Sequence, residues 1–557
     1  MQQHAEVRVP VLVVGGSLVG LSTSLFLGRL GIEHMLVERH AGTSMHPRGR
    51  GNNVRTMELF RTAGVDDPIR EAGQVLAGNH GILQTPSLVG GGGEWLIKEV
   101  QHSSGAARFS PAPWCVCSQN DLEPVLLEYA QKYGGDLRYS TELRSFEQDD
   151  AGVTAVVEDR MTGRLGTVRA DYLVAADGPR SPIRERLGIG RSGPGDLFHN
   201  VSITFRSHGL AAVVGDRRFI VCYLTDPAAD GALLPVDNAE SWVFHAPWQP
   251  QTGETLDDFT DERCIAHIRR ATGVLDLDVE ITGKAPWHAA ERVAERYADG
   301  RVFLAGDSAH EMSPTGAFGS NTGIQDAHNL AWKLAAVLRG HAGPGLLETY
   351  DAERRPVAVA TSKRASARSE EHSHPGYAPA PGGGGKQSGM LTVALGYRYR
   401  SGAVLGADPE LPIVPQALQL TGEPGSRAPH LWVRRGGESG MVSTLDLYER
   451  SFVLLTDAGP GGGAWHAAGV DAAARLRVPL DVYRIGEGAG ADLVPETGVD
   501  WRAAHGTTGE GALLVRPDGF VAWRSPGSVP DPEAMLSDVL ETLLHRSPSA
   551  RGAAANA

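Results

Sequence analysis

The fold of this chain is decided by the segment Val7-Arg-Val-Pro-Val-Leu-Val-Val14-Gly15-Gly16-Ser17-Leu18-Val19-Gly20-Leu21. Its β-branched run predicts a buried strand over 7–14, and the glycines predict a tight turn. The pattern that follows predicts a helix over 18–30, and a second apolar run reaches Glu38. This order of strand, glycine turn, helix and strand is a βαβ unit.

The glycine spacing is that of a dinucleotide-binding turn. In such a turn the first glycine allows the bend, the second admits the pyrophosphate, and the third lets helix and strand pack closely. Ser17 stands at the second position, but its small side chain can donate to a phosphate, so we expect binding to be retained. Glycine-rich turns also occur as plain packing, but Glu38 lies where an acceptor for ribose hydroxyls is required.

Two further motifs place an acidic residue beside a glycine at the end of a predicted strand. Gly306-Asp307 follows a short apolar run over 301–305, and Pro314–Asn321 precedes a long helix predicted over 323–338. Asp307 can accept from polyol hydroxyls, while the amides of 316–321 can face an electron-rich ring. Asp177-Gly178 ends another strand and by itself is compatible with an ordinary capped turn.

Length and composition narrow the class of protein. A chain of 557 residues predicts three to four domains. The hydrophobic fraction of 41% and charged fraction of 21% are typical of a globular protein. The 66 acidic residues exceed the 52 basic ones and give a net charge of −14, which argues against nucleic acid as a partner.

Four cysteines without a CxxC motif form no disulfide framework, so a reducing cytoplasm is expected. Cys115 and Cys117 alternate as on a strand and are expected to be buried thiols, and the pair His372 and His374 lies in loop-like sequence, so no metal site is predicted. The uncharged stretch 9–28 is interrupted by glycines and is better explained by a strand and a helix than by a membrane span. We therefore expect no membrane segment.

A Pro- and Gly-rich stretch over 371–387 predicts a linker, after which 401–548 has its own strands and a closing helix. Within that part, Gly459-Pro-Gly461-Gly-Gly-Ala464 follows a strand, and Asp481 comes about twenty residues later. This pattern leaves open a second, nicotinamide-binding unit, although a proline in the turn is atypical.

In their order and separation, the three glycine–acid motifs resemble those of the class A flavoprotein aromatic monooxygenases, the p-hydroxybenzoate hydroxylase family. More narrowly, the chain looks like the bacterial hydroxylases that tailor aromatic polyketides. The resemblance covers 1–372 and is supported by His46-Pro47-Arg48, Arg55-Thr56-Met57-Glu58-Leu59, Gln119 with Leu122-Glu123-Pro124, and Leu347–Pro356. Gly425–His430, Ser443–Leu447 and Val515–Gly519 resemble the thioredoxin-like C-terminal domain of that subgroup.

The resemblance implies an α/β fold with a GR2-type, Rossmann-like FAD-binding domain, an inserted β-sheet substrate domain and a thioredoxin-like C-terminal domain. The expected boundaries are 1–75, 102–182 and 283–372 for the FAD-binding domain, 76–101 and 183–282 for the substrate domain, 373–400 for the linker, and 401–548 for the C-terminal domain. No cysteine follows Cys264, so dithiol chemistry is excluded from that last domain.

The resemblance also implies non-covalent FAD, with NADPH or NADH as reductant. The cofactor residues it implies are Gly15, Ser17, Leu18, Val19 and Gly20 at the pyrophosphate, Glu38 at the adenosine ribose with Arg39 beside it, Arg48 and Gln119 along the phosphate–ribityl region, Asp307 at the ribityl chain, Pro314, Gly316, Gly319 and Asn321 beside the isoalloxazine, and Asp177 in a motif linked to FAD and NAD(P)H. Arg48 is the one catalytic candidate, because its charge can steady a reduced, anionic flavin. A surface salt bridge is the alternative interpretation of Arg48.

The implied reaction transfers oxygen from a flavin C4a-hydroperoxide to an aromatic, polyketide-type substrate. Baeyer–Villiger oxygenation and a non-catalytic flavin-binding protein remain alternatives. Residues 183–282 are expected to form one wall of the pocket, with Phe205, Tyr223, Leu224, Trp242 and Phe244 as candidate contacts. The expected partners are a small aromatic substrate and O2, in a cytoplasmic monomer or homodimer.

Overall fold

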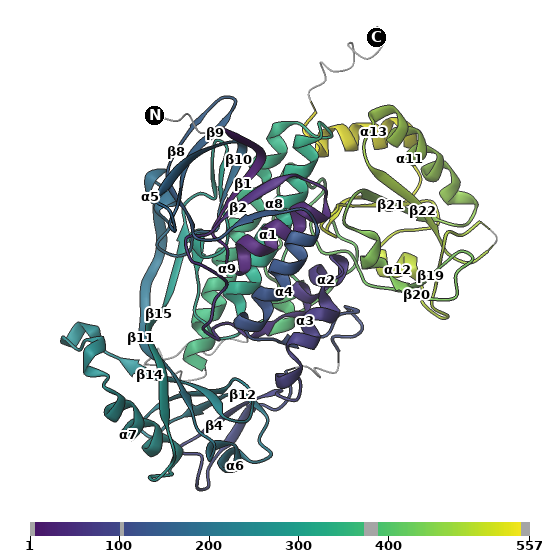
Figure 1. The fold of residues 1–557 in the computed structure, drawn as a ribbon. Helices are drawn as coiled ribbons and strands as arrows, with labels where there is room; N and C mark the ends of the chain where they lie inside the picture. The colour runs from purple at the N-terminus through teal and green to yellow at the C-terminus, as the bar shows by residue number, and fades with distance from the viewer. Residues whose placement is uncertain (1–5, 101–104, 372–387, 489, 547–557) are drawn as a thin grey trace.

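The computed structural model describes residues 6–100, 105–371, 388–488 and 490–546. In this part the chain forms three large β-sheets, each with helices of its own (Figure 1). The predicted pair His372 and His374 lies outside the described residues.

The first sheet contains the predicted βαβ unit. Its strands run in the order β16-β17-β10-β1-β2-β7, and β1 pairs in parallel with both β2 and β10. An antiparallel extension, β8 and β9, continues from β10. The strands are β1 (Val7–Val14), β2 (His34–Val37), β7 (Asp136–Arg138), β8 (Thr141–Asp149), β9 (Gly152–Asp159), β10 (Arg164–Ala175), β16 (Ala298–Asp299) and β17 (Val302–Leu304).

Helices cover the first sheet and separate it from the C-terminal part of the chain (Figure 1). Helix α8 begins at Phe318, earlier than predicted, because Ala317 in a left-handed conformation (φ 54°) marks its start. The helices of this part are α1 (Leu18–Arg29), α2 (Val54–Thr62), α3 (Asp66–Ala72), α4 (Gln119–Lys132), α5 (Pro182–Arg186), α8 (Phe318–Leu338) and α9 (Thr349–Glu371). A two-stranded ribbon, β3 (Gly51–Asn52) with β6 (Cys115–Val116), lies in the same part, and Cys115 and Cys117 are buried thiols as expected.

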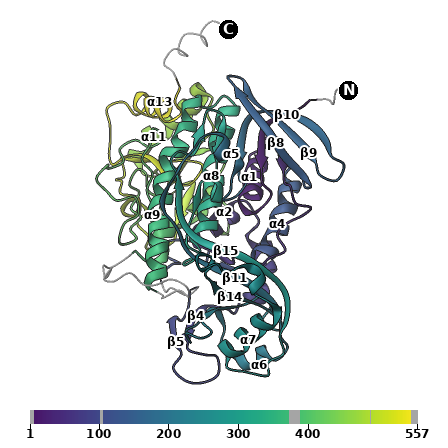
Figure 2. The same ribbon diagram turned by 90° about the vertical axis from the view of Figure 1, so that its left-hand side faces the viewer.

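The second sheet hangs below the first and is joined to it by two long strands, β11 and β15 (Figures 1 and 2). Its order is β18-β15-β11-β14-β13-β12-β4-β5. The strands are β4 (Gly81–Thr85), β5 (Glu94–Ile97), β11 (Arg191–Arg206), β12 (Phe219–Leu224), β13 (Gly231–Pro235), β14 (Ser241–Trp248), β15 (Glu280–Ala294) and β18 (His310–Glu311). One face packs on α6 (Leu210–Val214) and α7 (Asp261–Thr272) around a separate hydrophobic core.

The third sheet belongs to the C-terminal domain and has the order β20-β19-β23-β22-β21-β24-β25. The strands are β19 (Trp432–Arg435), β20 (Met441–Ser443), β21 (Phe452–Asp457), β22 (Leu480–Ile485), β23 (Leu493–Pro495), β24 (Ala512–Val515) and β25 (Val521–Ser525). Helices α11 (Gly463–Leu476) and α13 (Pro532–Leu543) pack against each other beside it, and α12 (Trp501–His505) is a single short turn. β21, α11 and β22 form a parallel βαβ unit, followed by the antiparallel pair β24–β25.

The α/β fold class is confirmed, and the structure refines how the chain is divided. β15 crosses residue 282, where the substrate domain was expected to end, so the second sheet continues beyond that residue. Residues within the expected linker 373–400 form helix α10 (Met390–Leu395), which packs beside α2. Ion pairs join the C-terminal domain to the first part of the chain, among them Arg29–Glu449, Arg61–Asp446 and Arg427–Glu58.

Candidate functional site

The turn between β1 and α1 requires glycine at two positions. Gly15 has φ +108°, and a Cβ atom there would lie 2.2 Å from the carbonyl oxygen of Ala176. A Cβ atom on Gly20 would lie 1.8 Å from the carbonyl oxygen of Gly15. These contacts bring the first turn of α1 against the strand ends, as the dinucleotide-binding pattern predicts.

The second motif packs directly on that first turn. A Cβ atom on Gly306 or on Gly323 would lie 2.6 Å from Cγ2 of Val19. Gly306 also has φ +63°, a left-handed conformation that favours glycine. The start of α1, the Gly306-Asp307 turn and the second turn of α8 are therefore neighbours in space.

The third motif adjoins the same turn. Ala176 donates its backbone N–H to Val14 over 2.8 Å, so Asp177 follows directly on the strand pair that carries Gly15. One carboxylate oxygen of Asp177 accepts from the backbone of Ile183, and the other, Oδ1, is buried without a partner in the described structure. Burial raises the pKa of Asp177 above its ordinary value. All three predicted motifs thus meet at one place.

Helices α1 and α8 both begin there without a side-chain cap, at Ser17 and Ala317. The first backbone N–H groups of a helix have no partner within the helix and carry partial positive charge. Amides of Leu18 and Val19 lie at one such end, and those of Phe318 and Gly319 at the other. This donor set fits FAD, since it offers one helix start to a pyrophosphate and another to an electron-rich ring.

Glu123 supported the family resemblance, but the sequence predicted no role for it in the site. It is fully buried on α4, and its carboxylate accepts from the hydroxyl of Ser17 (2.5 Å), the amide of Gln119 (2.7 Å) and the backbone of Ser44 (2.7 Å). Gln119 also donates to Ser17 over 3.0 Å. The spacing of four residues between Gln119 and Glu123, which aligns them on one helix face, was the available signal.

Glu38 lies at the end of β2, beside the glycine turn, as expected. Its two oxygens accept from the backbone of Gly16 (2.6 Å) and of His40 (2.8 Å). Arg39 next to it is exposed. The carboxylate is therefore held at the turn by two main-chain donors, in reach of the start of α1.

Asp307 follows Gly306 directly, and the charge of Arg48 acts on its carboxyl. The side chain of Asp307 is accessible to solvent, but protein atoms surround its carboxyl closely. This burial raises the pKa of Asp307 above its ordinary value, and the charges of His310 and Arg48 partly oppose the rise. Arg48 is exposed, which leaves its charge free for a bound anion. An acidic and a basic side chain are thus both accessible beside the Gly306-Asp307 turn.

Asn321 instead holds the loops around the site. It is almost fully buried, accepts from the backbone of Asn53 (2.9 Å), and donates to the carbonyls of Gly51 (2.8 Å) and Ala317. Pro314, Gly316 and Gly319 lie in the adjoining turn and first helical residues, at most partly buried. Asn321 fixes the position of this turn relative to residues 51–53.

The five aromatic and apolar candidates of the second sheet divide between its two faces. Four of them, Phe205, Leu224, Trp242 and Phe244, lie in the hydrophobic core shared with α6 and α7. Tyr223 points the other way, because neighbouring residues of a strand alternate between faces. Burial raises the pKa of Tyr223 to about 12, and the positive charge of Arg368 on α9 lowers it in part.

The face that carries Tyr223 is tied to the cofactor loops. Ser202 on β11 lies on this face, and its hydroxyl is 3.1 Å from Nε2 of His46. Arg50, fully buried, donates to the carbonyl of Pro235 at the end of β13, and burial lowers its pKa to about 10. Residues 46–50 therefore contact this face of the second sheet, and the pocket wall expected from the sequence stays a prediction.

The alternative nucleotide turn after β21 is not supported. The first residue pairs of β21 and β22 place Asp481 opposite Val453, near the start of β22, where its carboxylate accepts from Ser451. The glycines lie beyond the other end of β21, and the position of a Cβ atom on Gly461 is already filled by the carbonyl of Gly509 at 2.6 Å. Asp481 and the glycines are thus at opposite ends of the strands, so the structure does not support the second nucleotide site that the sequence left open.

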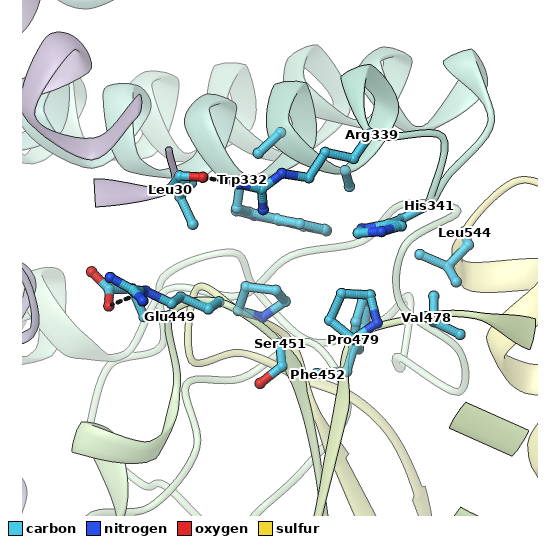
Figure 3. A pocket seen from close by; sticks show the side chains of 14 residues that line it. Leu30, Trp332, Arg339, His341, Glu449, Ser451, Phe452, Val478, Pro479 and Leu544 are labelled. Atoms are coloured by element: carbon cyan, nitrogen blue, oxygen red, sulfur yellow. Dashed lines mark hydrogen bonds and ion pairs between the residues drawn. The ribbon is translucent and has the colours of Figure 1, made fainter. Parts of the chain in front are cut away.

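A pocket that is open to solvent lies elsewhere, between α8 and the C-terminal domain (Figure 3). Trp332, Arg339 and His341 line one side, and Ser451, Phe452 and Pro479 line the other. It contains none of the three motifs, so we assign it to the seam between the domains.

Among the residues that the structure describes, none of the helices has the length and apolar character needed to span a membrane.

Comparison with known families agrees with this site. Residues 8–365 match the family described as "FAD binding domain", and residues 421–547 match "Aromatic-ring hydroxylase, C-terminal". A Streptomyces halstedii protein named "Putative polyketide hydroxylase" is 72% identical over 541 residues, which span 96% of this chain and 97% of that protein. The tetracenomycin A2 monooxygenase-dioxygenase of Streptomyces glaucescens is 42% identical over 98% of this chain and 99% of its own.

A solved structure has the same architecture over its full length. The ternary complex of aklavinone-11 hydroxylase with FAD and aklavinone superposes with a TM-score of 0.88 at 39% identity, over 98% of this chain and 100% of that one.

Proposed function

The chain belongs to the FAD-binding aromatic-ring hydroxylases, which are flavoprotein monooxygenases, and from this we propose that it hydroxylates an aromatic, polycyclic polyketide. NADPH or NADH is the proposed reductant, and O2 supplies the oxygen atom. The name of the relative from Streptomyces halstedii and the ligand of the aklavinone hydroxylase structure support this class of substrate.

One observation carries the proposal: Val19, at the start of α1, packs against both Gly306 and Gly323, the latter in the second turn of α8. Bound there, FAD would supply the oxygen-transferring chemistry. In our assignment, the amides of Leu18 and Val19 hold the pyrophosphate, Glu38 the ribose and Asp307 the ribityl chain. Arg48, whose positive charge acts on Asp307, is proposed to steady an anionic flavin.

The substrate is proposed to lie between the flavin and the second sheet. Tyr223, Ser202 and residues of the 46–50 loop line this face, and its polar groups would orient a hydroxylated ring. Burial of this face excludes water from the reacting centre, which limits side reactions. The four free, buried cysteines of the described chain support placing the enzyme in the reducing cytoplasm.

The test is oxidation of NADPH by the FAD-loaded protein against a panel of phenolic and quinonoid polycyclic compounds. We expect a true substrate to stimulate NADPH oxidation and to gain one oxygen atom in its mass. The gained oxygen is located by NMR, since an ester or lactone would indicate Baeyer–Villiger oxygenation and a new phenol hydroxylation. Absence of stimulation by every aromatic compound would overturn the proposed substrate class.

A variant pair connects this activity to the site. Asp307→Ala removes an acceptor beside Gly306 and is expected to increase hydrogen peroxide release per NADPH consumed. Asp257→Ala, on an exposed turn of the second domain, is the control and is expected to behave as the parent.

A further inference from the structure

The C-terminal domain reaches the flavin motif through a line of buried polar contacts. This line starts at Phe520, which follows the β24–β25 turn and whose ring stacks on Tyr399 with 4.1 Å between centroids. The hydroxyl of Tyr399 accepts from Nη1 of Arg354 on α9 over 3.1 Å. Both residues are almost fully buried.

Arg354 also binds two residues of α8. Its Nε donates to Oδ1 of Asp326 over 2.7 Å, and its Nη2 donates to the carbonyl of Thr322 over 3.1 Å. Burial alone would favour the neutral acid, but the charges of Arg354 and His310 hold the pKa of Asp326 below its usual value. The pair is therefore ionised and fixed in one geometry on both helices.

Asp326 ends the line at the flavin motif. Its second oxygen, Oδ2, accepts from the backbone N–H of Gly306 over 3.2 Å and lies 2.8 Å from Nε2 of His310. Gly306 precedes Asp307, and His310 closes the same turn. One carboxylate thus holds both ends of the turn that presents Asp307.

A second set of contacts fixes the two helices to the same part of the C-terminal domain. Arg516 bonds the carboxylate of Glu353 on α9, and Asp518 accepts from Asn329 and Trp332 on α8, each at 3.2 Å. Lys333 on α8 also donates to Glu353 over 2.7 Å. These side chains have essentially no exposed surface.

Stabilisation of the domain seam is the simpler explanation of such a network. However, a buried ion pair contributes little net stability compared with well-packed apolar residues, whereas it demands one geometry. Asp326 also uses one oxygen entirely on the Gly306–His310 turn. These contacts therefore fix the position of the Gly306–His310 turn more than they stabilise the fold.

We propose that Tyr399, Arg354 and Asp326 are positioning residues through which the C-terminal domain fixes the Gly306-Asp307 turn for FAD. The inference rests on the assignment of Asp307 to the flavin under the proposed function. It gives this domain, which has no cysteine, a role in the flavin site that does not require it to touch the cofactor.

The test compares Tyr399→Phe with Tyr397→Phe in the full-length protein. Both tyrosines contact Phe520, but in the described structure only the hydroxyl of Tyr399 bonds Arg354. We expect Tyr399→Phe to raise the dissociation constant for FAD about fivefold and to shift the midpoint potential of the bound flavin, since mutations along such a network change coupling by this order. Tyr397→Phe is expected to leave both quantities unchanged.

A double-mutant cycle separates positioning from general loosening. If Tyr399 acts through Asp326, the effects of Tyr399→Phe and Asp326→Asn on FAD affinity will not add. Should Asp326→Asn fail to fold, as judged by circular dichroism, Arg354→Lys replaces it in the cycle. Additive effects, equal effects of both tyrosine variants, or a lowered melting temperature with unchanged FAD affinity would overturn the proposal. FAD binding is measured without substrate, so failure of the proposed substrate class leaves this test intact.

Discussion

The hydroxyl of Ser17 lies 2.5 Å from Oε1 of Glu123, so the residue that replaces a glycine in the phosphate turn is held by a carboxylate of α4. A hydroxyl has one proton to donate, and here Glu123 receives it. Ser17 can therefore offer a phosphate its backbone N–H but not its side chain unless this bond opens. The hydroxyl of Ser17 therefore has a structural role in this structure, while its donation to a phosphate stays a prediction.

This relationship predicts different results for the two partners. Ser17→Gly should leave the dissociation constant for FAD within about twofold of the parent, because the backbone donors remain. Glu123→Ala removes the hydrogen bonds of Glu123 to Ser17, Ser44 and Gln119. It should raise the dissociation constant for FAD about tenfold, the order expected for losing hydrogen bonds to a charged group. Fluorescence titration of the apoprotein measures both, and a larger effect of Ser17→Gly would contradict the assignment.

Glu38 should matter for FAD far more than its neighbour in sequence Glu33. Glu38 sits at the glycine turn, while Glu33 is exposed before β2. Loss of a charged acceptor costs about 1.5–3 kcal/mol, so Glu38→Ala is expected to weaken FAD binding roughly 10- to 100-fold. The same titration on Glu33→Ala is the control, and comparable losses in both variants would refute the placement.

Arg48 should affect turnover more than FAD binding. Its guanidinium acts electrostatically on Asp307, and a fixed charge at a reacting centre contributes up to about 10²–10³ in rate. Arg48→Ala is expected to lower coupled hydroxylation at least about tenfold, measured as product formed per NADPH oxidised. Arg8→Ala is the control, since the side chain of Arg8 is 77% exposed on β1; full coupling in Arg48→Ala would show that Arg48 is a surface charge only.

The two faces of the second sheet predict opposite phenotypes. Phe244→Ala empties part of a closed core and should lower stability by about 3–5 kcal/mol, with little change in KM of the surviving enzyme. Tyr223→Phe removes only a hydroxyl from the opposite face and should change KM or coupling while the melting temperature stays nearly constant. Steady-state kinetics and thermal unfolding of both variants decide, and a KM effect confined to Phe244→Ala would reverse the assignment.

Acid should destabilise the C-terminal domain through His505. Burial lowers the pKa of this histidine to about 4, against the ordinary value of 6.5. The unfolded state therefore binds more protons between these values, and stability falls as pH decreases from 6.5 towards 4. Between pH 7 and pH 5 the loss is about 2 kcal/mol for this one residue.

Urea unfolding of the parent and of His505→Gln at both pH values measures this contribution. We expect the variant to show a smaller difference between pH 7 and pH 5, because Gln does not titrate. His208→Gln is the control, since the side chain of His208 is 80% exposed. An identical pH dependence in parent and His505→Gln would exclude His505 as the cause.

Short-range sequence patterns predicted the features that depend on neighbouring residues. The strand–glycine–helix order around Gly15 and Gly20, and the acid after the strand at Asp307, follow from neighbours in sequence, and the structure brings them together. The contact of Glu123 with Ser17 and the contacts from Tyr399 to Asp326 join residues far apart in the chain, so no local pattern in the sequence predicts them. The two faces of the second sheet could also be assigned from the sequence. Tyr223 and Leu224 are adjacent on one strand, so their side chains alternate and cannot both face the pocket.

Strand β15 serves both ends of the enzyme at once. Near its start Ala285 pairs with Ser202 on the pocket face, and near its end Val293 pairs with His310, just beyond Asp307. The distance between the proposed pocket wall and the flavin turn is therefore set by the number of strand residues between them, at roughly 3.3 Å per residue. Removing two residues would keep the remaining side chains on their own faces and shorten this distance by roughly 7 Å. We therefore expect the length of this strand to affect how large a ring system can lie between the proposed pocket wall and the turn.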